Sequence, residues 1–148
     1  MKNNDDNIEI ILAQWQTCVD MANSVSQRRD AMNNIFITLN LAILAAVSLA
    51  WDIKSVFILI AGIVICSIWI FFIKNYKSLN AAKYDVINKI ETKLPVAPFK
   101  DEWEILKKNN KYKDTTKLEK WLPITFILLY AVMVITIIIL KTTYPGGN

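Results

Sequence analysis

Three long runs without a charged residue constrain the fold of this chain more than any other feature. They are Ile35–Trp51, Ser55–Ile73 and Leu122–Leu140. At about 1.5 Å per helical residue, each is roughly 25–29 Å long, close to the ~30 Å hydrocarbon core of a bilayer. A soluble helical core is the alternative, but a chain of 148 residues that is 54% hydrophobic has too few polar helices to cover such runs. We therefore expect an all-α membrane protein with three transmembrane helices per protomer.

The distribution of basic residues predicts the orientation of these spans. Residues 52–54, between the first two spans, contain one acid and one base, whereas residues 74–121 contain twelve lysines and seven acidic residues. Positively charged flanks tend to remain in the cytoplasm. We therefore expect a cytoplasmic N-terminus, a cytoplasmic segment 74–121 and an external tail at 141–148. Because no strand-like alternation suggests an outer-membrane barrel, the bacterial inner (plasma) membrane is the expected location.

The segment before the first span, residues 1–34, has the pattern of a long amphipathic helix. Its apolar residues recur at steps of three and four and form one stripe: Ile8, Ile11, Leu12, Trp15, Cys18, Val19, Ala22 and Val25. No proline or glycine precedes Gly62, so this helix can continue into the span. An anionic leaflet would repel the acidic leading end, at Asp5, Asp6 and Glu9. We therefore expect the stripe to pack on protein and not on lipid.

The lysine-rich segment 74–121 has the pattern of a cytoplasmic helical hairpin between the second and third spans. Helical spacing continues past the second span and stops at Pro95 and Pro98, which cannot continue a helix. A second short helix is expected from about Asp101, with acids at its start and lysines at its end. The third span, 122–140, then follows.

Polar side chains in and before the first span are the candidates for pore-lining or interhelical residues. They are Asn33, Asn34, Thr38, Asn40 and Ser48. Headgroup depth would explain the first two without any function. Asn40 lies about 10 Å deeper than Asn33, where an unpaired amide costs several kcal/mol, so it needs either another helix or channel water as its partner. We expect that one copy cannot satisfy both this amide and the apolar stripe, which predicts a homo-oligomer with a coiled-coil-like collar.

The lysines of the hairpin are candidates for binding an anionic ligand. Lys107, Lys108, Lys111 and Lys113 form a locally positive run beside Tyr112. Retention in the cytoplasm would explain this density without any ligand. If the run is repeated around a ring, it would instead attract nucleotides, nucleic acid or acidic lipid. A cytoplasmic protein partner is also compatible with this segment.

The sequence lacks the residues that most enzymes and cofactor sites require. It contains no histidine and only two cysteines, Cys18 and Cys66, and it has no phosphate-binding loop or nucleophile elbow. We therefore expect neither catalytic residues nor a metal or cofactor.

The segment Asn80–Leu129 resembles the RipA-like octameric membrane proteins. The similarity lies in Lys83, Val86, Ile87, Glu91, Leu94, Pro95, Glu102, Trp103, Leu118–Trp121 and Pro123. The resemblance implies a bacterial inner-membrane homo-oligomer, with an octamer as the expected assembly. Some members of the family are similar to accessory proteins and others to effectors in phage-defence operons. Four of the shared residues are expected to be structural anchors: Pro95, Trp103, Glu119 and Trp121.

These expectations combine into two functional hypotheses. The leading one is an oligomeric pore or membrane-perturbing effector, active in anti-phage defence and gated by a cytoplasmic anionic ligand or partner. The alternative is a non-catalytic scaffold that anchors a soluble protein at the membrane. Substitution of Asn40 separates them, because a pore residue changes ion flux in an intact assembly, whereas a packing residue changes assembly alone.

Overall fold

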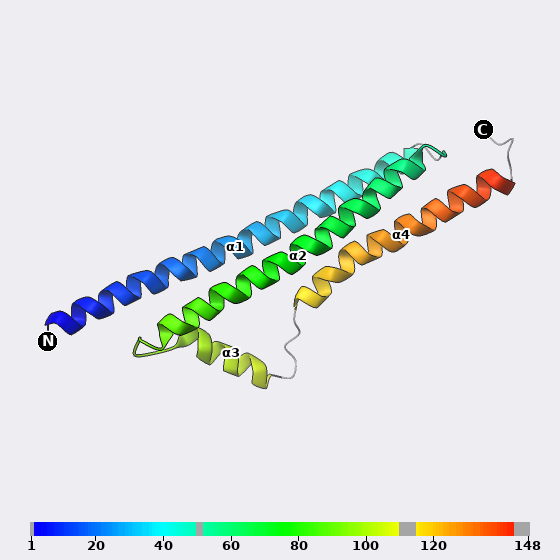
Figure 1. Cartoon of the computed structure of the whole chain (residues 1–148). Helices are drawn as coiled ribbons and strands as arrows, with labels where there is room; N and C mark the ends of the chain where they lie inside the picture. The colour runs from blue at the N-terminus through cyan, green and yellow to red at the C-terminus, as the bar shows by residue number, and fades with distance from the viewer. Residues whose placement is uncertain (1, 50–51, 110–114, 144–148) are drawn as a thin grey trace. The chain divides into compact units, whose positions relative to one another are not determined.

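The protein is described from a computed structural model, which places residues 2–49, 52–109 and 115–143. It has four helices, α1 (Lys2–Leu49), α2 (Ser55–Glu91), α3 (Pro98–Lys108) and α4 (Thr115–Thr143) (Figure 1). The placed residues include no strand, and α1, α2 and α4 are long and apolar enough to cross a membrane. The predicted all-α fold with three membrane-spanning helices is therefore confirmed.

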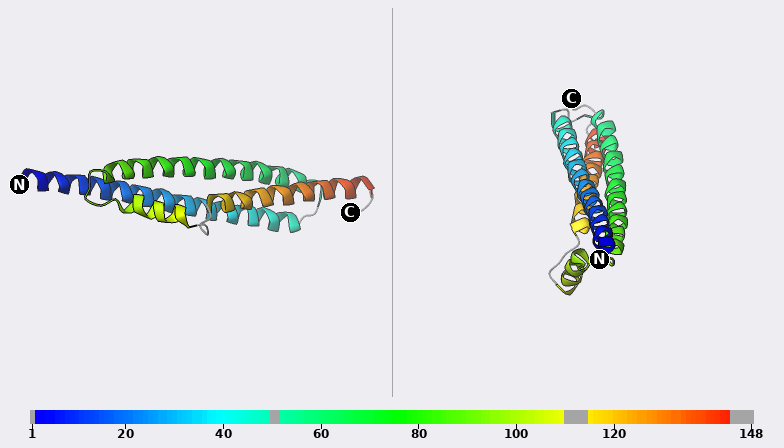
Figure 2. Two further views of the ribbon diagram at one scale, coloured as in Figure 1. Left: turned by 90° about the horizontal axis from the view of Figure 1, so that it is seen from below. Right: turned by 90° about the vertical axis from the view of Figure 1, so that its left-hand side faces the viewer.

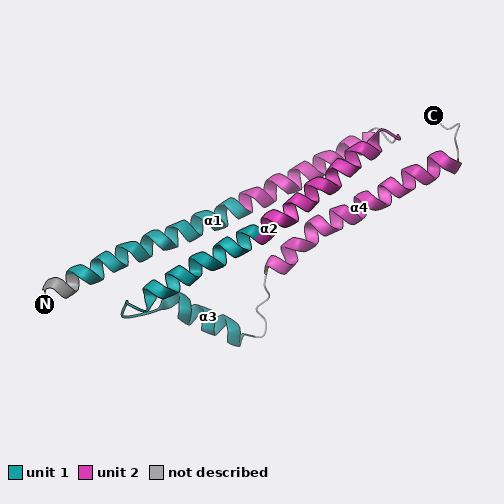
Figure 3. Cartoon of the chain, in the orientation of Figure 1, with its two compact units in different colours: residues 1–29, 75–114 teal, residues 30–74, 115–148 magenta. Residues whose placement is uncertain are grey.

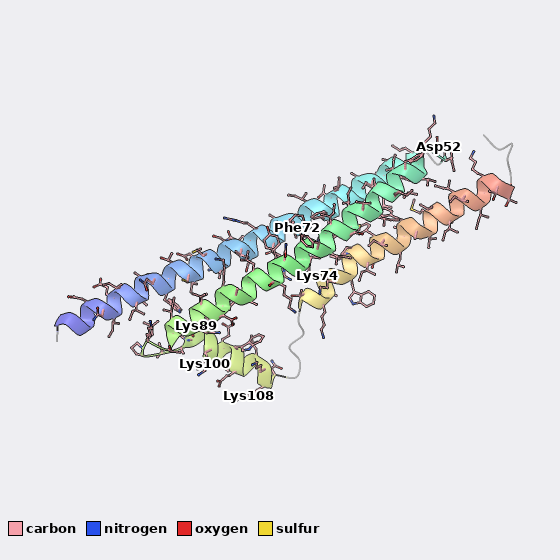
Figure 4. The ribbon with its side chains drawn as sticks, in the orientation of Figure 1. Asp52, Phe72, Lys74, Lys89, Lys100 and Lys108 are labelled. Atoms are coloured by element: carbon pink, nitrogen blue, oxygen red, sulfur yellow. The ribbon has the colours of Figure 1, made fainter. Side chains whose placement is uncertain are left out.

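Local sequence explains where the long helices begin and end. α1 is unbroken because it contains neither proline nor glycine. The side chain of Asp52 accepts a hydrogen bond of 3.1 Å from the backbone N–H of Ser55, the first residue of α2, where a helix needs an acceptor (Figure 4). Pro123 lies inside α4, which begins at Thr115.

The chain divides into two compact units, and α1 and α2 run through both (Figure 3). Unit 2 consists of residues 30–74 and 115–148 and holds the three apolar spans. Its buried core is formed by Val47, Leu59, Cys66, Tyr130 and Ile137. In α2, 28% of the apolar 18-residue stretch that could cross a membrane is buried inside the protein, compared with 11% in α1 and 17% in α4. α2 is therefore the central helix, and α1 leaves most of its membrane surface uncovered.

Unit 1 consists of residues 1–29 and 75–114, which include α3. Ala22 and Val25 of α1 are buried, as is Ile87 of α2. α3 turns back from the end of α2 (Figures 1 and 2). The apolar stripe of α1 is thus partly covered by the chain's own α2, whereas Ile8 and Leu12 stay exposed. The expectation that one copy leaves the stripe uncovered is correct only for this leading end.

Candidate functional site

A buried polar cluster joins the three spanning helices of unit 2. The side-chain oxygen of Asn40 on α1 accepts hydrogen bonds from the hydroxyl of Tyr130 on α4, at 2.8 Å, and from the thiol of Cys66 on α2, at 3.0 Å. All three residues are completely buried. A carbonyl oxygen has two lone pairs, so both acceptor positions of this amide are filled.

The remaining bonds of the cluster fix the orientation of the Asn40 amide. Its side-chain nitrogen donates to the backbone oxygen of Phe36 at 2.7 Å, one turn earlier on α1. The hydroxyl of Tyr130 also lies 3.2 Å from the backbone oxygen of Asn40. The amide is therefore satisfied within one chain. Of the two expected partners, another helix or channel water, the structure shows other helices, because side chains of α2 and α4 donate to this amide. The expectation that one copy cannot satisfy it is wrong.

A glycine on α2 allows α4 to approach this cluster. A Cβ atom placed on Gly62 would lie 2.7 Å from the Cε2 atom of Tyr130, closer than real Cβ contacts occur. Any larger residue would therefore push the tyrosine ring away from Asn40. The close packing of α2 and α4 and the hydrogen bond of Tyr130 depend on the same missing side chain.

A second hydrogen bond between helices involves Asn33. This residue lies near the start of the part of α1 that belongs to unit 2. Its side-chain oxygen accepts a hydrogen bond of 2.8 Å from the indole nitrogen of Trp69, which is completely buried on α2. The ring of Trp69 stacks on Phe36 with centroids 5.5 Å apart and planes 4° apart, and it also contacts Phe126 on α4. Asn33 thus has an interhelical partner within its own chain.

The other predicted residues of this strip point away from the core. Asn34, Thr38 and Ser48 are exposed. The hydroxyl of Thr38 donates to the backbone oxygen of Asn34 at 2.9 Å, and that of Ser48 to Ala45 at 2.7 Å. At about 100° per residue, Asn34 and Thr38 lie about 140° and 180° around α1 from the buried Val47, whereas Ser48 lies only about 100° from it. The five candidates therefore split into two that bind neighbouring helices and three that are exposed, two of which lie on the outer face of α1.

The centre of unit 1 is Glu91, the last residue of α2. Its side chain is 1% exposed and accepts three hydrogen bonds. One comes from the indole nitrogen of Trp15 on α1, at 3.2 Å, and two from the backbone N–H groups of Phe99 and Lys100 at the start of α3, at 3.1 and 3.2 Å. The carboxylate therefore links α1, α2 and α3.

This carboxylate caps α3 in place of a local capping residue. The N-cap position is Ala97, whose side chain cannot accept a hydrogen bond, and Pro98 follows it. The negative charge of Glu91 lies at the positive end of the helix dipole, where it stabilises the helix. The ring of Phe99 contacts Trp15 and Tyr84, with centroids 5.8 and 5.6 Å away, so apolar contacts hold the capped end in place.

Two of the four predicted anionic-ligand residues lie at the other end of α3. Lys107 and Lys108 are exposed in its last turn, and Lys108 is labelled in Figure 4. The ammonium group of Lys107 lies 5.5 Å from the centre of the Trp103 ring, a cation–π distance. Lys111 and Lys113 fall outside the described residues.

The four predicted anchors are not deeply buried in the chain. Pro95 lies in the bend between α2 and α3 and is exposed. Trp103 and Trp121 are 48% and 63% exposed, and Glu119 on α4 is half-buried. The proline forms the expected corner. The two tryptophans offer apolar surface that the protomer itself does not cover.

The chemistry of the two centres is that of joints between helices. Among residues 2–49, 52–109 and 115–143, no group of three or more metal-ligating side chains comes together. Cys66 is buried in the core of unit 2, and both cysteines are free of disulfides. Sequence reasoning missed Cys66, Tyr130, Trp69 and Trp15 as partners. Only Tyr130 carried a signal, because tyrosine favours the ends of spans and this one lies well inside its own.

Comparison with known families decides the class of this three-span architecture. A family model described as Octameric membrane protein family (8xMP) matches residues 12–139. The chain belongs to this family. Comparison with curated proteins and with solved structures gave no significant match.

Membership in the octameric membrane protein family confirms the resemblance seen in the sequence. The protein is a multi-pass membrane protein that associates with itself. The matched region includes both polar centres, from Trp15 to Tyr130. A self-associating protein needs surfaces that face its copies. Of the three spanning helices, α1 has the least buried apolar stretch, so it offers the most exposed surface for such contacts.

Proposed function

We propose that eight copies form a ring in the bacterial inner membrane, with α1 facing the central axis, and that this ring is a pore or membrane-perturbing effector. The observation that carries the proposal is the outer face of α1, where Asn34 and Thr38 are exposed opposite the buried side of the helix and Ser48 is exposed at its flank. Small polar side chains gain little from lipid contact but are compatible with water or with another helix.

The geometry of an eight-membered ring supports a water-filled centre. Eight helices packed about 9–10 Å apart in a circle leave an opening roughly 12–15 Å across, after the thickness of the helices is subtracted. Side chains as short as those of Thr38, Ala45 and Ser48 are too small to close it. Because Asn40 is engaged by Tyr130 and Cys66, it contributes to the stability of the wall and not to its lining.

The orientation and regulation follow from charge. We place the N-terminus and the lysine-rich segment in the cytoplasm, because positive flanks favour that side. Lys107 and Lys108 of eight copies would surround the cytoplasmic mouth, where an anionic ligand or protein partner could control opening. Activity in anti-phage defence is the biological role we propose for such a gated effector.

Conductance of reconstituted protein tests the pore. Liposomes that contain the full-length octamer should release potassium and small dyes. Thr38→Trp should lower release at least several-fold, because eight indole rings would narrow the opening. Leu39→Trp is the matched control, since Leu39 is also exposed but projects about 100° away around α1. Mass measurement of each variant checks that the assembly is intact.

A non-conducting scaffold is the competing function, and the same experiment separates the two. Intact octamers that leave liposomes sealed would favour the scaffold. Equal release from Thr38→Trp and wild type would contradict the placement of α1 at the axis. A scaffold would be supported further by the exposed apolar surface of Trp103 and Trp121.

A further inference from the structure

The α1–α2 pair of unit 1 has two different sides. On one side, Trp15 and Tyr84 contact Phe99 of α3. Met21 and Val86 line an open groove between the same two helices. At about 100° per residue, Met21 lies roughly 120° around α1 from Trp15, and Val86 lies roughly 160° around α2 from Tyr84. The groove therefore opens on the side of the pair away from α3.

The groove is apolar with one basic residue. It has a volume of about 290 Å³ and is lined by Cys18, Met21, Ala82, Lys83 and Val86. Met21 and Val86 are 51% and 47% exposed. Large exposed apolar side chains next to each other indicate a surface that binds a partner. The charge of Lys83 favours a partner with a nearby carboxylate.

α3 carries an edge that fits these requirements. Ile105 is 68% exposed, whereas Phe99 and Leu106 of the same helix are half-buried. Asp101 and Glu102 precede Ile105 by four and three residues, so their side chains are its neighbours on the helix surface. The edge thus combines one large apolar side chain with two carboxylates, and its charge is opposite to that of Lys83.

The edge and the groove also lie at similar levels along α2 within unit 1. Phe99 is level with Glu91, to which its N–H group is bonded. α3 turns back along α2 (Figure 2), and Ile105 lies six residues, or about 9 Å, further along α3 than Phe99. Val86 lies about 8 Å before Glu91 along α2, so both the edge and the groove extend in the same direction from Glu91. A rotation axis perpendicular to the membrane keeps each residue at the same depth in every copy, so only equal depths can meet.

We propose that the Ile105 edge of α3 docks into the Cys18–Val86 groove of the neighbouring copy, with Glu102 paired to the neighbour's Lys83. A contact between two different surfaces on opposite sides of a protomer is heterologous, and such contacts form a ring when the rotation from copy to copy closes. The inference rests on the octamer of the proposed function and names its cytoplasmic interface. Unit 1 is then the part of the chain that joins one copy to the next.

Cross-linking in membranes tests this contact, because Cys18 is a native residue of the groove. Full-length Ile105→Cys should react with a short bis-maleimide to give covalent dimers and higher oligomers up to the octamer. Adding Cys18→Ser should abolish these products. Lys100→Cys is the matched control, since Lys100 is exposed but lies about 140° around α3 from Ile105, and it should give no adduct.

Charge reversal provides a second, independent measurement. Lys83→Glu should lower the fraction of octamer by at least tenfold in native lipid discs, and Glu102→Lys in the same chain should restore it. Glu104→Lys is the control for added charge and should restore nothing.

Three results would overturn the docking. They are an octamer of unchanged mass without the Ile105→Cys adduct, an adduct that survives Cys18→Ser, and an adduct with a different protein. The first leaves the octameric pore intact, so the two proposals fail separately. A wild-type protein that remains a single copy would overturn both.

Discussion

The hydroxyl of Tyr130 on α4 donates a 2.8 Å hydrogen bond to the side chain of Asn40 on α1, although the two residues are 90 positions apart in the chain. Cys66 on α2 supplies a second donor to the same oxygen. One amide thereby contacts all three spans. Because hydrocarbon offers no competing donor, the bond helps to select one arrangement of the helices in unit 2.

Tyr130→Phe should destabilise the protein by about 0.5–2 kcal/mol, because it removes an interhelical hydrogen bond within the membrane. The free energy of unfolding in mixed detergent micelles is the quantity to measure. Thr136→Val is the matched control, since Thr136 is exposed on α4 and bonds only to the backbone of Val132. An effect of equal size in both variants would contradict a role for the Asn40 contact.

Gly62→Ala should cost about 1–3 kcal/mol, because the added methyl group would lie 2.7 Å from the Tyr130 ring. The thermal midpoint in detergent would report this loss. Ala61→Val adds carbon at the neighbouring exposed position and should leave the midpoint almost unchanged. Combining Gly62→Ala with Tyr130→Leu should recover part of the loss, and a purely additive result would argue against overpacking as the cause.

Glu91→Ala should release the start of α3, since it removes the acceptor for the N–H groups of Phe99 and Lys100. Loss of a helix cap costs about 0.5–2 kcal/mol, and Glu91→Gln should show a smaller effect because one oxygen remains. Hydrogen exchange of the α3 amides is the direct measurement. Glu104→Gln, at an exposed position, should not accelerate exchange, and a protected α3 in Glu91→Ala would contradict the capping role.

Lys107→Glu combined with Lys108→Glu should abolish binding of ATP or polyuridylate to the purified octamer. Both side chains are exposed in the last turn of α3, so reversal removes positive charge and loses only the contact of Lys107 with the Trp103 ring. Wild-type affinity should fall steeply with salt, as expected for an electrostatic contact. Binding measured by fluorescence anisotropy that is identical in wild type and double variant would contradict an anionic ligand at this position.

The helices could be predicted from the sequence because their signals are local. Charge-free runs predict the spans, and Pro95 and Pro98 predict the end of α2. The resemblance across Asn80–Leu129 likewise predicted the family, since it depends on residue identities and not on contacts. These features need no information on which helices meet.

The partners of Asn40 and Glu91 could not be predicted in this way. The sequence showed that a submerged amide needs a donor, but Tyr130 and Cys66 become its donors only when α4 and α2 pack beside α1. Glu91 is one of the residues that resemble the octameric family. Its role as the cap of α3, however, depends on a hydrogen bond from the backbone of Phe99. Bonds between distant segments are set by packing, and a single sequence gives no direct record of them.

The placement of α3 and the groove on opposite sides of the α1–α2 pair has a genetic consequence. A copy with Ile105→Asp would keep its groove and accept one neighbour, but it would offer no edge to the next. Mixed with wild-type chains, such copies would end growing arcs before they close. A minority of defective subunits would then inactivate most assemblies, so the mutant allele should be dominant over the wild type.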